Sequence, residues 1–377
     1  MRFIVSSSEL LMHLQMVSKV IGNRNSLPIL DNFLFNLRKD EVLTVTTSDL
    51  ETTLTTEIED LSMVEGEGNI AIESKRLLEI LRLLPEQPLT FEINEENLDA
   101  IIFSENGEFS IAAYPPEDFP LPPEVDKEKG VDLVLDANLF LNGINTTLFA
   151  TGDDELRPVM NGIFIEFFPD YMNFVASDAH KLVRYRRNDA KTGIEKSFIL
   201  PNKPSSLLKS FLSKEDNVSL KFDDKNAIFS IGNRKLVCRL QEGEYPAYNN
   251  VIPLENPNKM VIERMDFLNS LKRVHAFSNE ITSLVELELD KDQIKVSAKD
   301  VDYNVSAYEN LSCEYSNEKI KIGFKGSYLT EILQNLKSAD INFELSDPNR
   351  AALLFPYVNE NENEDVLMLI MPMMIDV

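Results

Sequence analysis

Ser177, Asp178 and His180 place a hydroxyl, a carboxylate and an imidazole within four residues of the chain. These are the side chains of a nucleophile, an orienting acid and a general base, so one hypothesis is a hydrolase that uses Ser177 or His180. Neighbouring side chains on one strand or turn diverge, whereas a nucleophile and its base must converge on the reacting atom. The spacing therefore argues against catalysis. A screen of ester and phosphate substrates would test the hydrolase hypothesis directly.

Other chemistry is sparse in this sequence. His13 and His275 fall in predicted helices and have no His or Cys at metal-ligand spacing. The 13 glycines are scattered and form no phosphate-binding loop, and Cys238 and Cys313 lack CxxC spacing, which favours buried free thiols. We therefore expect no metal, no cofactor and no enzymatic activity.

The Asp178 turn belongs to a pattern that occurs three times. Asp49, Asp178 and Asp300 each follow an alternating apolar run, at steps of 129 and 122 residues. A carboxylate at the same point of three repeats suits the stabilisation of a turn better than an active site. A second marker keeps nearly the same period, with steps of 128 and 122 residues between Lys75, Lys203 and Lys325.

A period of about 125 residues is the length of a whole domain. The sequence therefore predicts three domains, at 1–123, 124–253 and 254–377. The proline-rich stretch Pro115–Pro123 closes the first domain as a stiff linker.

Each predicted domain contains two units of one strand, one amphipathic helix and three meandering strands. In the first helix, Leu10, Leu14, Val17 and Ile21 recur at three- and four-residue steps, with Ser7 or Ser8 as its cap. The pattern predicts an α+β fold with two helices on one side of every domain. The six helices are expected at about 8–21, 74–84, 136–149, 203–213, 265–277 and 327–337.

Charge is distributed unevenly between these elements. Counted with their flanking residues, over 7–24, 74–84, 136–150, 202–214, 264–277 and 325–337, the six helical segments together carry a formal charge of +8, against −26 for the whole chain, so the remaining residues carry −34. One explanation is that solvated helices commonly carry Lys and Arg. The other is that an acidic surface elsewhere repels nucleic acid, so that weak phosphate contacts are confined to the helix side. The longest apolar runs are shorter than the ~18 residues that span a membrane, and no signal peptide is recognisable. We expect a cytoplasmic protein.

The segment Leu369–Met374 is apolar and contains three methionines. Pro372 prevents a regular central strand through it. Two interpretations remain open for this segment: packing in a buried core, or an adaptable pocket for a peptide.

The whole chain resembles the beta subunit of bacterial DNA polymerase III, the beta sliding clamp family. The resemblance is carried by motifs in the same order on a three-domain chain: Met1–Phe3, Arg24–Leu30, Thr47–Glu51, Asp118–Pro120, Asn161–Gly162, Ala176–Leu182, Ser278–Glu280 and Met371–Met373. It implies three repeated domains of the DNA-clamp fold, which close head to tail into a homodimeric ring around duplex DNA. It also implies a non-enzymatic DNA polymerase processivity factor.

The resemblance implies partners and residues for them. Double-stranded DNA would be held without sequence recognition, and replicative polymerase, clamp loader and repair proteins would bind through short linear motifs. The expected DNA-facing residues are Arg24, Arg82, Lys203 and Lys209 by resemblance, Lys272 and Lys325 from the helix charges, and Arg157 as the remaining candidate in the acidic loop 152–159.

The peptide groove implied by the resemblance is apolar and joins residues distant in sequence. Its expected members are Met160, Ser177, Ala179, His180, Lys181, Leu182, Pro246, Val251, Leu369, Met371, Pro372, Met373 and Met374. Met374 stands where family members often have a basic residue. At the ring interface, Phe109 and Ile111 would meet Ala276 and Phe277, with Arg76 close by. Glu108 replaces a residue that is often basic there.

Overall fold

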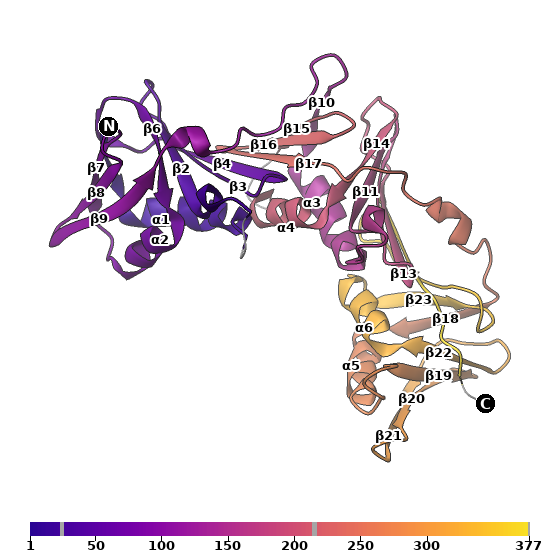
Figure 1. Ribbon diagram of the computed structural model, residues 1–377. Coiled ribbons are helices and arrows are strands. Elements are labelled where there is room, and N and C mark those ends of the chain that lie inside the picture. Colours follow the sequence, from indigo (N-terminus) through magenta and orange to yellow (C-terminus); the bar gives the residue numbers. More distant parts are fainter. Residues whose placement is uncertain (23–25, 213–216, 376–377) are drawn as a thin grey trace. The chain divides into compact units, whose positions relative to one another are not determined.

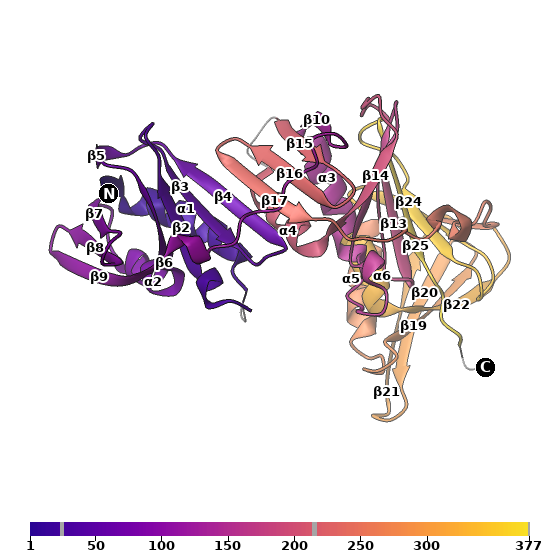
Figure 2. The ribbon, with the colours of Figure 1, turned by 45° about the horizontal axis from the view of Figure 1, so that its top comes forward.

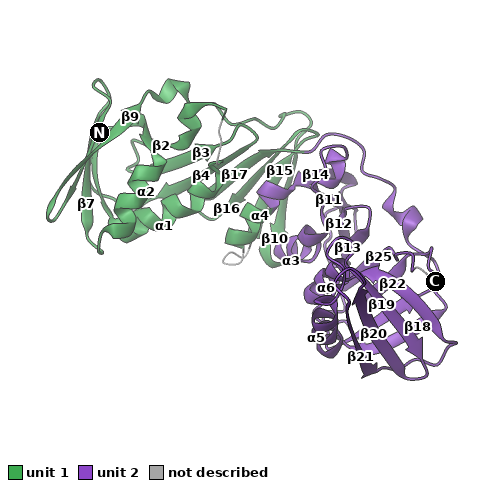
Figure 3. Cartoon of the chain, turned by 60° about the horizontal axis from the view of Figure 1, so that its bottom comes forward, with its two compact units in different colours: residues 1–138, 206–240 green, residues 139–205, 241–377 purple. Residues whose placement is uncertain are grey.

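The computed structural model describes residues 1–22, 26–212 and 217–375. The described chain divides into two compact units, drawn in green and purple in Figure 3. Unit 1 comprises residues 1–138 and 206–240, and unit 2 comprises residues 139–205 and 241–377. The boundary therefore passes through the predicted middle domain instead of following the three-part repeat.

Unit 1 contains one continuous antiparallel sheet and the helices α1 (Ser7–Val17) and α2 (Ser74–Leu83), which contact each other and pack on strands β2, β3, β4 and β6 (Figure 1). The strand order is β10-β15-β16-β17-β4-β3-β2-β6-β9-β8-β7-β1-β5. The strands are β1 (Arg2–Ser6), β2 (Asn32–Leu37), β3 (Leu43–Ser48), β4 (Thr52–Ile58), β5 (Ser62–Glu65), β6 (Gly68–Glu73), β7 (Pro88–Asn94), β8 (Asp99–Ser104), β9 (Gly107–Tyr114), β10 (Val131–Asp136), β15 (Asn217–Phe222), β16 (Asn226–Ile231) and β17 (Arg234–Arg239).

Unit 2 contains two antiparallel sheets, with strand orders β14-β11-β12-β13-β25-β24-β23-β18 and β21-β20-β19-β22. Figure 2 shows β13, β25 and β24 side by side. The strands are β11 (Gly162–Phe167), β12 (Met172–Ser177), β13 (Lys181–Arg187), β14 (Lys196–Pro201), β18 (Asn258–Glu263), β19 (Leu284–Asp290), β20 (Gln293–Asp300), β21 (Val305–Ser312), β22 (Ile320–Lys325), β23 (Asp340–Leu345), β24 (Ala352–Pro356) and β25 (Glu364–Ile370).

Helices α5 (Arg264–His275) and α6 (Gly326–Asn335) contact each other in unit 2. Gly326 permits this close approach, because a Cβ at that position would lie 2.5 Å from the His275 ring. The boundary between the units falls within α3 (Ala137–Thr147) and α4 (Asn202–Phe211).

Apolar periodicity explains how the helices pack. In α1, Leu10, Leu14 and Val17 are fully buried, and His13 joins them as a packed histidine whose Nδ1 lies 2.7 Å from Thr56 Oγ1. Burial lowers the pKa of His13. The predicted cap at Ser7 or Ser8 is wrong: Ser6 caps α1, because its hydroxyl accepts a bond from the Glu9 amide.

The three repeated turns have the predicted carboxylate role. Oδ1 of Asp178 accepts bonds from the amides of His180 (2.9 Å) and Lys181 (2.8 Å), and Asp49 and Asp300 make the same pair of contacts two and three residues onward. The first two turns join strands through three residues, the middle of which, Leu50 or Ala179, has a positive φ. These aspartates are structural residues of the repeat.

Most predicted elements agree with the structure to within a few residues. The helix predicted at 8–21 ends as an α-helix at Val17 and continues as the 3₁₀ helix Ser18–Val20, and the one at 136–149 ends in the same way. Strand β5 was not predicted; it is short and largely exposed, so it lacks a clear apolar alternation. Among the described residues, no helix is long and apolar enough to cross a membrane.

Candidate functional site

An apolar hollow of about 270 Å³ lies within unit 2. It is bordered by the 3₁₀ helix Pro158–Met160, by the turn between β12 and β13, by the segment Tyr245–Val251 and by the end of β25. Its lining residues are Met160, Ser177, Ala179, His180, Lys181, Leu182, Tyr245, Pro246, Ala247, Tyr248, Val251, Leu369 and Met371.

The floor of the hollow is formed by the pairing of β13 with β25. Leu182 and Leu369 are directly opposite each other in this ladder and are 3% and 2% exposed. Strand alternation places both on the same face of the sheet. The ladder ends at Ile370, and the Met371 amide then donates to the His180 carbonyl at 2.9 Å, which holds the chain end beside the turn.

Two tyrosines form one wall. Tyr245 stacks on Phe164 with ring centroids 4.7 Å apart, and Tyr248 meets the same ring edge-on at 6.5 Å. The Tyr248 hydroxyl donates to Glu166 at 2.6 Å and accepts from Asn173 at 3.3 Å. Burial, reinforced by Glu166, raises the pKa of Tyr248. The wall is therefore fixed to β11 and β12 before any ligand arrives.

The residues that suggested a hydrolase serve the turn. The Ser177 hydroxyl donates to the Lys181 carbonyl at 2.9 Å and accepts from the Ala179 amide at 3.1 Å. His180 stacks on Tyr328, with ring centroids 5.7 Å apart. The Ser177 proton is thus directed to the backbone instead of to a base, and this geometry gives the hydrolase hypothesis no support.

Lys181 is the buried charge at the floor. Its ammonium lies 2.7 Å from Asp178 and 3.1 Å from Glu331, and 4.4 Å from the centre of the Tyr328 ring. Burial by itself lowers the pKa of Lys181, but the bonds to Asp178 and Glu331 outweigh it and hold the pKa above its usual value. The lysine stays charged and ties the turn to helix α6.

The structure brings ten of the thirteen predicted groove residues to this hollow. Pro372, Met373 and Met374 lie outside its lining: the Met373 amide donates to Gly323 at 2.8 Å, and Met374 is 78% exposed. Tyr245, Ala247 and Tyr248 line the hollow and were missed. The sequence signal that could have identified them is the position of Tyr245 and Tyr248 on either side of Pro246, in a segment predicted to connect two domains.

The predicted DNA-facing residues differ in how exposed they are. Arg82, Lys209 and Lys272 are exposed in the last turns of α2, α4 and α5. Lys203 and Lys325 are half-buried at the starts of α4 and α6, and the Lys325 ammonium lies over Tyr328. Arg157 pairs with Asp154 at 3.0 Å, and Arg24 lies outside the described residues.

Among the predicted interface residues, the structure buries Ile111 and leaves the others at least partly exposed. Arg76 and Phe277 are exposed, as is Ala276, and Phe109 is half-buried near the start of β9. Ile111 is only 2% exposed within unit 1, because strand alternation turns it toward the interior. It therefore offers no side-chain surface for the predicted contact.

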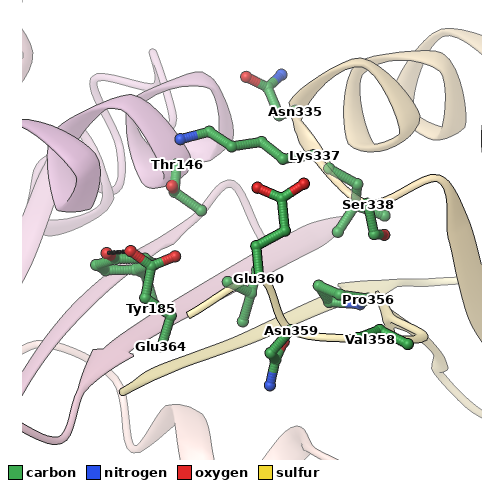
Figure 4. A pocket seen from close by; sticks show the side chains of 12 residues that line it. Thr146, Tyr185, Asn335, Lys337, Ser338, Pro356, Val358, Asn359, Glu360 and Glu364 are labelled. Atoms are coloured by element: carbon green, nitrogen blue, oxygen red, sulfur yellow. Dashed lines mark hydrogen bonds between the residues drawn. The ribbon is translucent and has the colours of Figure 1, made fainter. Parts of the chain in front are cut away.

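A second, smaller hollow in unit 2 has both polar and apolar lining residues (Figure 4). Its volume is about 50 Å³, against about 270 Å³ for the apolar hollow. Thr146, Lys337 and Glu360 extend toward the space, and the Tyr185 hydroxyl beside it donates to Glu364 at 2.8 Å. The apolar hollow is the larger of these two and is the candidate site.

Solved structures define the class of protein to which this fold belongs, the sliding clamps. The chain is similar to a sliding clamp from Pseudomonas aeruginosa solved with griselimycin (25% identity, TM-score 0.92) and to one from Bartonella birtlesii solved with the same compound (28%, TM-score 0.91). Each comparison covers 100% of both chains.

The family follows from the sequence comparisons. The models for the N-terminal, central and C-terminal domains of the DNA polymerase III beta subunit match residues 1–123, 134–247 and 249–374. The chain is 29% identical to the beta sliding clamp of Haemophilus influenzae over 99% of this chain and 100% of that protein, and 29% identical to that of Synechocystis over 94% and 96%. The chain belongs to the DNA polymerase III beta subunit family, whose members are processivity factors of DNA polymerase.

Proposed function

We propose that this chain tethers its partners by binding a short apolar motif of each in the hollow of unit 2, here called the peptide groove. The observation that carries this proposal is the preformed apolar floor of Leu182 and Leu369 beside the fixed wall of Tyr245 and Tyr248. At the edge, the flexible side chain of Met371 is 39% exposed and can adapt to different motifs beside the stiffer Val251. Replicative polymerase, clamp loader and repair proteins are the proposed partners.

The test is fluorescence anisotropy with a labelled peptide of the Gln-x-x-Leu-Phe type. We expect saturable binding to the protein and weaker binding to the Met371→Ala variant, because Met371 borders the groove and is 39% exposed. Met374→Ala is the matched control, since Met374 lies outside the lining. Absence of binding to the unmodified protein would reject the groove as a tether.

We infer further that two copies close head to tail into a ring. Support comes from two strand edges that have no paired strand in the described part of the chain: the outer side of β9 over residues 107–112, and the outer side of β21. Such edges pair readily with another strand. Tyr308 on β21 and Phe277 nearby are 65% and 43% exposed, which provides apolar surface for the contact.

The proposed ring encircles duplex DNA in the cytoplasm and is held by topology. The exposed cations Arg82 and Lys209 of unit 1 and Lys272 of unit 2 support weak, sequence-independent phosphate contacts from the helices, and Lys203, Lys325 and Arg157 are further candidates. Loading onto a nicked circle with a clamp loader tests this: retained protein should leave the DNA after linearisation. Equal retention on linear DNA would reject encirclement.

A further inference from the structure

The rim of the peptide groove carries an excess of negative charge. Three segments that contribute lining residues to the groove, 152–160, 177–182 and 241–251, contain six acidic residues and two basic ones. Asp153, Glu155, Glu242 and Glu244 are exposed, so their carboxylates face solvent.

Two of these acidic segments are anchored at the Met160 end of the groove. The Gly152 amide donates to the Met160 carbonyl at 2.8 Å, which fixes the start of the loop with Asp153 and Glu155. Gly243 packs so closely on Val159 that a Cβ would lie 2.7 Å from its side chain. Glu242 and Glu244 flank that glycine, so their backbone is held beside the same 3₁₀ helix.

The neighbouring cations offset little of this charge. Lys181 is 5% exposed and already pairs with Asp178 and Glu331, and Arg157 pairs with Asp154. Lys325 is half-buried over Tyr328, on the side of the groove where His180 stacks on the same ring. In these segments the Met160 end therefore presents four exposed carboxylates, those of Asp153, Glu155, Glu242 and Glu244, against one exposed cation, Arg157, which is paired with Asp154.

We propose that the peptide groove selects apolar motifs flanked by Lys or Arg residues, which lie over the carboxylates at its Met160 end. This inference rests on the proposed function of the groove. The apolar side chains of the motif fill the hollow, while the basic flank supplies the opposite charge at its edge. An acidic flank meets like charges at the same place and is disfavoured.

The test compares two labelled peptides with the same Gln-x-x-Leu-Phe core, one flanked by two lysines and one by two glutamates. At 20 mM salt we expect the lysine-flanked peptide to bind about tenfold more tightly, and at 500 mM salt the ratio should fall below about threefold, because salt screens exposed charges. Equal affinities at 20 mM salt would overturn this inference and leave the groove intact. Failure of both peptides to bind would instead overturn the proposed function.

A charge-removal variant locates the effect. Glu242→Gln with Glu244→Gln should reduce the ratio at 20 mM salt by about threefold or more. The matched control, Asp170→Asn with Glu362→Gln, removes the same charge at the far ends of β12 and β25, roughly 16 Å along the strands from the groove. The control should leave the ratio unchanged. An equal loss in the control would show that overall charge, not the rim, sets the preference and would overturn the inference.

Discussion

Lys181 and Asp178 form a buried ion pair whose energetic coupling can be measured by a double-mutant cycle. The ammonium and carboxylate lie 2.7 Å apart, and their side chains are 6% and 15% exposed. The Coulomb attraction at this distance is about 6 kcal/mol for an effective dielectric constant of ~20. The cost of burying each ion cancels in the cycle, and Glu331 keeps a second partner beside Lys181, so the measured coupling should lie well below this value, at about 2 kcal/mol.

The two substitutions are Lys181→Met and Asp178→Asn. Methionine keeps most of the buried volume without the charge, and asparagine keeps the oxygen that accepts bonds from the His180 and Lys181 amides. The turn can therefore persist in every variant. Glu331 remains as a second partner of Lys181 at 3.1 Å, so Asp178→Asn should cost less than isolating a buried lysine.

Urea unfolding followed by circular dichroism gives the free energies of unfolding for the cycle. Because the chain has two compact units, hydrogen exchange of the His180 amide provides a local measure of the same coupling. The control cycle uses Lys321 and Glu286, which lie 3.0 Å apart but with 47% exposure of the lysine, and should give less than about 1 kcal/mol. A Lys181–Asp178 coupling below about 0.5 kcal/mol would refute this account of the pair.

Three other outcomes test the groove, the proposed ring and an exposed ion pair. Leu182→Ala should lower the free energy of unfolding by about 2–4 kcal/mol, because Leu182 is 3% exposed in a packed cluster; a loss below 1 kcal/mol in urea unfolding would contradict that packing. Phe109→Ala should shift the dimer toward monomer, and an unchanged mass by light scattering at low concentration would refute its placement at the interface. Arg273 lowers the pKa of Glu309 through a bidentate ion pair, so the stability from this pair is present above the usual Glu value of 4.5 and is lost as pH falls through the lowered value. Arg273→Met should reduce the change in melting temperature between pH 5 and pH 3. A pH profile of the melting temperature equal to that of the unmodified protein would argue against the pairing.

The sequence predicted local structure well because its signals are local. The three- and four-residue steps of Leu10, Leu14 and Val17 indicated α1, and alternation indicated most strands. The role of Asp178 followed from its recurrence, since a side chain two or three residues from its amide partners needs no distant contact. The groove residues beyond the turn came from family resemblance; Pro372, Met373 and Met374 lie outside the lining of the hollow, and Tyr245 and Tyr248, which line it, were not among the predicted residues.

The sequence by itself determined the triplicate, the helix and strand elements, the acidic balance and the family. Only the tertiary structure decided that β17 pairs with β4 and β13 with β25, so that sheets run across the predicted domain boundaries. Backbone hydrogen bonds between strands do not depend on which side chains the residues carry, and an edge strand can pair with many different strands. The groove depends on one such pairing, because Leu182 and Leu369, 187 residues apart in the sequence, meet only where β13 lies beside β25.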